Sequence, residues 1–141
     1  MFGHDRATLR AQYGNAWRKA RAGEPLSPLE QALARLVEDH PEYHPLFGEH
    51  GDAALEREFS PDTGQENPFL HLGLHMALRE QVATDRPAGI RRIHKRLSAR
   101  QGSAHAAEHV MMNCLGQALW EAQRSGQPPD ENRYVDCLKR L

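Results

Sequence analysis

Nine histidines stand in this chain of 141 residues, and six of them form three pairs whose members are four positions apart. Residues four positions apart share one face of a helix, so each pair can present two imidazoles side by side. Imidazole is the commonest side-chain ligand of transition metals in proteins. The candidate metal ligands are therefore His40, His44, His71, His75, His105 and His109.

A hydrogen-bonded histidine core layer is the alternative interpretation of these residues. A buried histidine is more often a core residue with hydrogen-bond partners than a metal ligand, so a single pair is weak evidence. Three pairs on separate segments favour a metal site, because the imidazoles of a core layer would all have to stay neutral and hydrogen-bonded together.

The ligand types restrict the metal. Nitrogen ligands suit divalent transition metals and argue against magnesium and calcium, so zinc or iron is expected, with nickel or copper also compatible. Neutral imidazoles leave the charge of the ion uncompensated, and Glu108, Asp39 and Glu42 are candidates to orient the imidazoles or to bind the ion directly. A hydrolytic, a redox and a sensing role are all compatible with such a site. The sequence identifies no catalytic residue and leaves open whether the protein is an enzyme.

Capping residues and prolines in the sequence indicate where the helices that carry these histidines begin and end. Ser27-Pro28-Leu29-Glu30 has the form of a capping box at a helix start, and Asn67-Pro68 combines a capping side chain with a first-position proline. The two prolines that follow His40 and His44 predict that the second helix stops and a short new turn begins. Helices are expected over residues 5–22, 27–40, 67–85, 88–100, 104–124 and 130–141, with a long loop at 48–66 that holds one helical turn at 53–59.

No segment alternates polar and apolar residues with a period of two, so the fold class is all-α. We expect an antiparallel bundle of five to six helices that forms a single domain over residues 1–141. Short connections favour antiparallel neighbours, which brings the end of the second helix to the starts of the third and fifth. At about 1.5 Å per residue, all three histidine pairs then lie near one end of the bundle. The six histidines are expected to share one layer.

Composition excludes several classes of protein. The net charge is −1 with the charged residues interspersed, so no nucleic-acid partner is expected. No apolar stretch is long enough to span a membrane, and the first residues have no apolar signal region. Cys114 and Cys137 are expected to be buried reduced thiols, since both lie on apolar helical stretches without C-x-x-C spacing. These features predict a soluble cytoplasmic protein, and a homo-oligomer is compatible with them.

A basic helix face supports an alternative function of another class. The stretch from Arg86 to Arg100, which includes the predicted helix over residues 88–100, carries several cations and no acid. It could serve a non-catalytic interaction module that contacts phosphates or an acidic partner protein. No aromatic residue interleaves for base stacking, so a solvated helix face is the simpler interpretation. The cations are Arg86, Arg91, Arg92, Lys95, Arg96 and Arg100.

Seven sequence blocks together resemble an uncharacterised bacterial family catalogued as domain of unknown function eighteen forty-one. That resemblance implies a small cytoplasmic helical protein and supplies no activity. The histidine layer is also similar to DinB-type and hemerythrin-like metal-binding helical bundles, although the Glu-x-x-His repeat of di-iron bundles and the His-x-x-x-Glu of hemerythrin are absent. The blocks are Ala16-Trp-Arg-Lys19, Gly23-Glu-Pro-Leu26, His40-Pro-Glu-Tyr-His44, Asn67-Pro-Phe-Leu-His71, Asp85-Arg-Pro-Ala-Gly-Ile90, Ala107-Glu-His109 and Trp120-Glu-Ala-Gln-Arg124.

Overall fold

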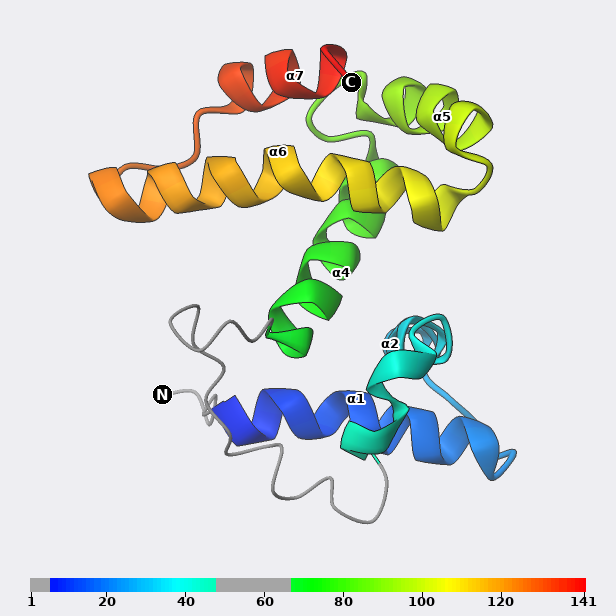
Figure 1. The fold of residues 1–141 in the computed structure, drawn as a ribbon. Coiled ribbons are helices and arrows are strands. Elements are labelled where there is room, and N and C mark those ends of the chain that lie inside the picture. Colours follow the sequence, from blue (N-terminus) through cyan, green and yellow to red (C-terminus); the bar gives the residue numbers. More distant parts are fainter. Residues whose placement is uncertain (1–5, 48–66) are drawn as a thin grey trace. The chain divides into compact units, whose positions relative to one another are not determined.

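The computed structural model describes residues 6–47 and 67–141, and these residues confirm the all-α fold class (Figure 1). The predicted loop at 48–66 and the capping residue Asp5 lie outside the described residues. No strand occurs in the two described stretches. The elements are α1 (Arg6–Arg21), α2 (Pro28–Glu38), the 3₁₀ helix η1 (Pro41–Phe47), α4 (Pro68–Thr84), α5 (Ile90–Gln101), α6 (Ala104–Ser125) and α7 (Glu131–Lys139).

The chain divides into two compact units, Met1–Gly73 and Leu74–Leu141. Helix α4 contributes its first residues to one unit and the remainder to the other. Each unit is described by itself below, and the expectation of a single domain over residues 1–141 stays a prediction. None of the described helices is both long enough and apolar enough to cross a membrane.

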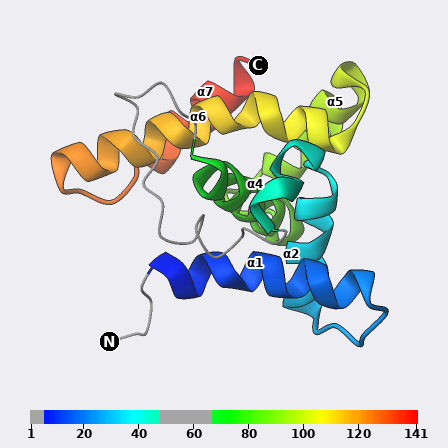
Figure 2. The same cartoon turned by 60° about the horizontal axis from the view of Figure 1, so that its bottom comes forward.

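The first unit is built on the crossing of α1 and α2, which meet at a steep angle (Figure 2). The predicted capping box at the start of α2 is confirmed, because Ser27 Oγ accepts the Glu30 N–H at 3.1 Å and Glu30 Oε1 accepts the Ser27 N–H at 3.0 Å. The apolar face of α2 is buried through Leu36 and Val37. The capping residues therefore predicted where α2 begins.

Two prolines end α2 as expected. The helix stops at Glu38, Asp39 is its C-terminal cap, and a separate 3₁₀ helix, η1, begins at Pro41. Residues that precede a proline resist the helical conformation, which explains why α2 does not continue through His40. His40 and His44 thus lie just after α2 and within η1.

Glu30 also links α1 to α2 and supplies a prediction about pH. The ammonium group of Lys19 donates to Glu30 Oε2 at 2.8 Å, and this bond together with the Ser27 N–H lowers the pKa of Glu30 to about 2. A folded-state pKa below the unfolded one stabilises the fold above the ordinary pKa, and this contribution is lost as the pH falls through the folded value. Glu30→Gln should therefore lower the free energy of unfolding at pH 7, and its difference from the wild type should shrink toward pH 2.

Urea unfolding of both proteins at a series of pH values between 7 and 2 checks this prediction. A difference that stays constant across the series would show that the charge of Glu30 makes no contribution.

Helix α4 begins where its sequence predicts. Asn67 Oδ1 accepts the N–H groups of Phe69 and Leu70 at 3.0 and 3.3 Å, and Pro68 occupies the first helical position. The helix ends at Thr84, and Asp85 then takes a left-handed conformation with φ of 52°. The Asp85 side chain accepts the N–H groups of Gly89 and Arg91 and so ties this turn to the start of α5.

The second unit is organised around α6, its longest helix, with α5 and α7 packed along one side of it (Figure 1). The second half of α4 crosses α6 steeply. We expected these two helices to run alongside one another, as in a bundle, and they do not. Ser103 and Asp130 cap α6 and α7 as predicted. The core of the unit contains Leu78, Ile90, Ile93, Leu97, Ala107, Met111, Met112, Cys114, Leu115, Ala118, Tyr134 and Leu138.

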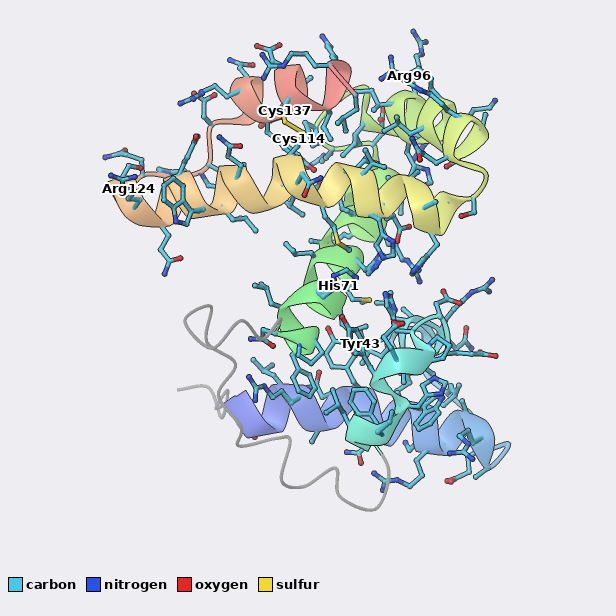
Figure 3. The ribbon with its side chains drawn as sticks, viewed as in Figure 1. Tyr43, His71, Arg96, Cys114, Arg124 and Cys137 are labelled. Carbon is cyan, nitrogen blue, oxygen red and sulfur yellow. A yellow bond between two sulfur atoms is a disulfide. The ribbon has the colours of Figure 1, made fainter. Side chains whose placement is uncertain are left out.

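The prediction of two reduced cysteines is wrong. Cys114 on α6 and Cys137 on α7 form a disulfide (Figure 3). Packing of α7 along α6 brings the two Cα atoms to 5.8 Å, within the range that a disulfide bridges. The cysteines are 23 positions apart, and sequence spacing gives no sign of this tertiary proximity.

Candidate metal centre

Three of the predicted ligands come together within the second unit. His75 is on α4, and His105 and His109 lie in the first turns of α6. The ring centroids are 4.5 Å apart for His75 and His105, 4.9 Å for His75 and His109, and 4.5 Å for His105 and His109. Each ring offers a nitrogen within 4.8 Å of those of the other two. These three histidines therefore form a group that could hold a metal ion.

The nitrogens of the three rings lie close to the spacing that a bound ion needs. Two nitrogens that bind one zinc ion at 2.0–2.1 Å can be at most about 4.2 Å apart. A separation as large as 4.8 Å would close by a small rotation of the side chains. His109 is exposed and so has room to make this movement.

Glu108 orients His75. The Nδ1–H of His75 donates to Glu108 Oε1 at 2.7 Å, and Nε of Arg79 donates to the same oxygen at 3.1 Å. An ionised carboxylate can only accept hydrogen bonds, so Nδ1 of His75 carries a hydrogen, and in the neutral ring Nε2 carries the lone pair. Metal-binding histidines usually make this kind of bond from the nitrogen that does not bind the metal.

Glu108 itself remains ionised although its side chain is buried. Burial by itself would raise the pKa of Glu108, but the hydrogen bond from His75 and the charge and hydrogen bond of Arg79 outweigh that effect and hold the pKa below its usual value. The site thus contains one carboxylate that is fixed by two donors. This negative charge would partly compensate a divalent cation held by neutral imidazoles.

His94 approaches the same carboxylate from α5. Its Nε2 is 3.9 Å from Glu108 Oε2, which is too long for a direct hydrogen bond. The His94 side chain is largely buried. His94 therefore belongs to the surroundings of Glu108.

The three histidines differ in their exposure to solvent. His75 is fully buried, His105 is half-buried and His109 is exposed. The helical spacing of His105, His109, Met112, Gly116 and Trp120 predicts that they share one buried face. Met112 is buried as this spacing predicts, but His109 and Trp120 are exposed. The buried face of α6 passes through Glu108, Met111 and Leu115 instead, so the histidines lie at the border of the core.

The other three predicted ligands belong to the first unit. Nδ1 of His40 is 2.9 Å from the Leu36 carbonyl oxygen. Because a carbonyl oxygen can only accept a hydrogen bond, Nδ1 is the donor. The His40 ring contacts those of Tyr43 and His71, with centroids 5.3 and 5.1 Å away. His44 donates from Nε2 to the Val37 carbonyl at 2.8 Å, and its ring is 4.4 Å from that of Trp17.

The structure therefore brings His40 and His71 together in one unit and His75, His105 and His109 together in the other. A single layer of all six histidines stays a prediction, since the two units are described separately. The roles of Asp39 and Glu42 stay predictions as well. Arg79 was missed by the sequence analysis, although it lies four positions after His75 and so on the same face of α4.

The basic face of α5 is partly engaged within the fold. Arg91 donates to the Val82 and Ala83 carbonyls at the end of α4 at 3.1 and 2.7 Å, and Arg100 donates to the Leu141 carbonyl at 2.7 Å. The remaining cations are exposed, namely Arg86, which precedes α5, and Arg92, Lys95 and Arg96 on α5. An interaction module that uses them stays a prediction.

Comparison with known families agrees with the resemblance found in the sequence. The pattern of a family described as a domain of unknown function, DUF1841, matches residues 5–140, so the chain belongs to this family. No curated protein and no solved structure matches the chain significantly. The similarity to DinB-type and hemerythrin-like bundles is not confirmed.

Proposed function

We propose that this protein binds a divalent transition metal through His75, His105 and His109, with Glu108 orienting His75. The hydrogen bond of 2.7 Å between His75 Nδ1 and Glu108 carries the proposal. It fixes the tautomer in which Nε2 of His75 has a lone pair, and this is the arrangement that metal sites with histidine ligands commonly use. The closeness of the rings of His105 and His109 to that of His75 supports the proposal as well.

Zinc or iron suits this group best, and nickel or copper is compatible with it. The donors are imidazole nitrogens, which magnesium and calcium do not favour. A bound ion of this kind supplies Lewis acidity, and iron or copper also supplies redox chemistry. The residues named above would bind and orient the ion. A hydrolytic, a redox and a sensing role are each compatible with such an ion, and the proposal extends to metal binding.

His40, His44 and His71 remain ligands predicted from the sequence. His40 has a tautomer of the same kind as His75, because Nδ1 donates to the Leu36 carbonyl and Nε2 holds the lone pair. His44 has the opposite tautomer, with Nε2 as the donor. Replacing each of the three by alanine and measuring metal affinity would test whether they take part.

Removal of metal should lower the melting temperature of the protein. An ion that binds the folded state alone and is present at about 100 times its dissociation constant adds about 2.7 kcal/mol of stability. For a chain of this size this corresponds to roughly 5–10 °C. Thermal unfolding followed by circular dichroism, before and after verified removal of metal with a chelator, measures the shift.

The His109→Ala variant is the matched control, since a chelator should not change its melting temperature. If the wild type melts at the same temperature with and without metal, the histidines form a metal-free cluster and the proposal is wrong.

A further inference from the structure

A small hollow opens onto the disulfide between α6 and α7. Its volume is about 70 Å³, and both Cys114 and Cys137 line it. The two cysteines differ in their exposure, because Cys114 is only 2% exposed and belongs to the core while Cys137 is partly buried at its edge. A nucleophile that enters this hollow would therefore reach Cys137 more easily than Cys114.

Charged residues of both signs surround the hollow. Arg133 and Arg140 line it, together with Glu121 and Asp130. Glu121 is 3.6 Å from Arg133, so these two charges offset one another, and Asp130 accepts the Arg133 backbone N–H as the cap of α7. Nearby cations stabilise thiolates, which are the species that attack disulfides.

Helix α7 has other attachments to the second unit besides the disulfide. Tyr134 and Leu138 are buried in the core, and the Tyr134 hydroxyl donates to Gln81 Oε1 on α4 at 2.7 Å. These contacts do not depend on the bond between the cysteines. Cleavage of the disulfide should therefore leave α7 docked on α6.

We propose that Cys137 is a site of reversible thiolation by a low-molecular-weight thiol, which attacks the disulfide from this hollow. The incoming thiolate forms a bond to Sγ of Cys137, and the bond between the two protein sulfurs breaks. Its electron pair goes to Sγ of Cys114, which takes a proton from solvent. The disulfide of the protein is the oxidant, and the product carries a mixed disulfide at Cys137 and a buried, unreactive thiol at Cys114.

The probe for this site is glutathione, added to the oxidised full-length protein. After the reaction is stopped with acid, free thiols are alkylated and the peptides that contain each cysteine are identified by mass spectrometry. The expected product has glutathione on Cys137 and the alkyl group on Cys114. Glutathione found mainly on Cys114, or equally on both, overturns the proposal, as does the absence of any adduct under conditions in which the urea-unfolded protein reacts.

Two matched variants test whether Cys137 is more reactive than Cys114 when only one of the two cysteines is present. Cys114→Ser leaves Cys137 as a free thiol, and Cys137→Ser leaves Cys114. The Cys114→Ser variant should react with glutathione disulfide at least about 10-fold faster than the Cys137→Ser variant, because a thiol in an apolar core is inert. Equal or reversed rates contradict the proposal, and the product mapping on the wild type decides the matter if either variant does not fold.

Discussion

Replacing His109 with alanine should weaken metal binding at least about 100-fold, because even the loss of a group that only orients a ligand commonly costs 10–100-fold. His109 is exposed, so its removal should leave the stability of the metal-free protein nearly unchanged. The same loss of affinity is expected for His75→Ala and His105→Ala. Competition with a chromophoric chelator measures the affinity, and thermal unfolding of the metal-free proteins measures stability.

Asn113→Ala is the control for His109→Ala, since Asn113 is also exposed and lies one turn further along α6. It should bind metal like the wild type.

Glu108→Gln should give an intermediate result, a loss of metal affinity of roughly 10–100-fold, because glutamine retains an acceptor for His75 but loses the charge. Its control is Glu121→Gln on the same helix. Metal affinity that is unchanged by alanine at His109 and His105 would exclude these histidines as ligands.

Reduction of the disulfide should lower the free energy of unfolding by about 3 kcal/mol. Chain-entropy arguments give this value for a loop that joins cysteines 23 positions apart. The reduced protein should still be folded, since natural domains of this kind have about 5–15 kcal/mol of stability and the core contacts of Tyr134 and Leu138 remain. Chemical denaturation with and without a dithiol reductant measures the difference.

The double variant Cys114→Ser/Cys137→Ser is the control, because a reductant should not change its stability. If the wild type loses less than about 1 kcal/mol on reduction, then the disulfide adds little constraint to the unfolded chain.

Local sequence signals predicted the helix boundaries because they act through neighbouring residues. The box of Ser27 and Glu30 and the cap of Asn67 were recognisable since each satisfies backbone N–H groups within its own first turn. The break between α2 and η1 followed from prolines alone. These features require no knowledge of how helices pack.

Features that depend on packing between helices were harder to predict. The contact between Cys114 and Cys137 arises from the way α7 lies on α6, and neither position marks it in the sequence. The helical spacing of His105, His109 and Trp120 predicts one buried face of α6, whereas Trp120 is exposed and Glu108 is buried. The bond from Arg79 to Glu108 joins α4 to α6 and so depends on packing as well.

The positions of the histidine pairs were predictable only in part. Their spacing correctly indicated that His105 and His109 share a region of α6, and the rings of both contact that of His75. The choice of Glu108 as an orienting acid also agrees with its hydrogen bond to His75. The further step to six histidines in one layer depends on the arrangement of the two units and stays a prediction.

The metal content of the protein, purified without a histidine tag and measured by elemental analysis, tests the central claim most directly. Sites of this type bind tightly enough to retain their ion through purification. We expect about one transition-metal ion per chain in the wild type and a much smaller amount in His109→Ala. Fewer than about 0.1 ions per chain, with no uptake when zinc or ferrous iron is added, would contradict the proposal.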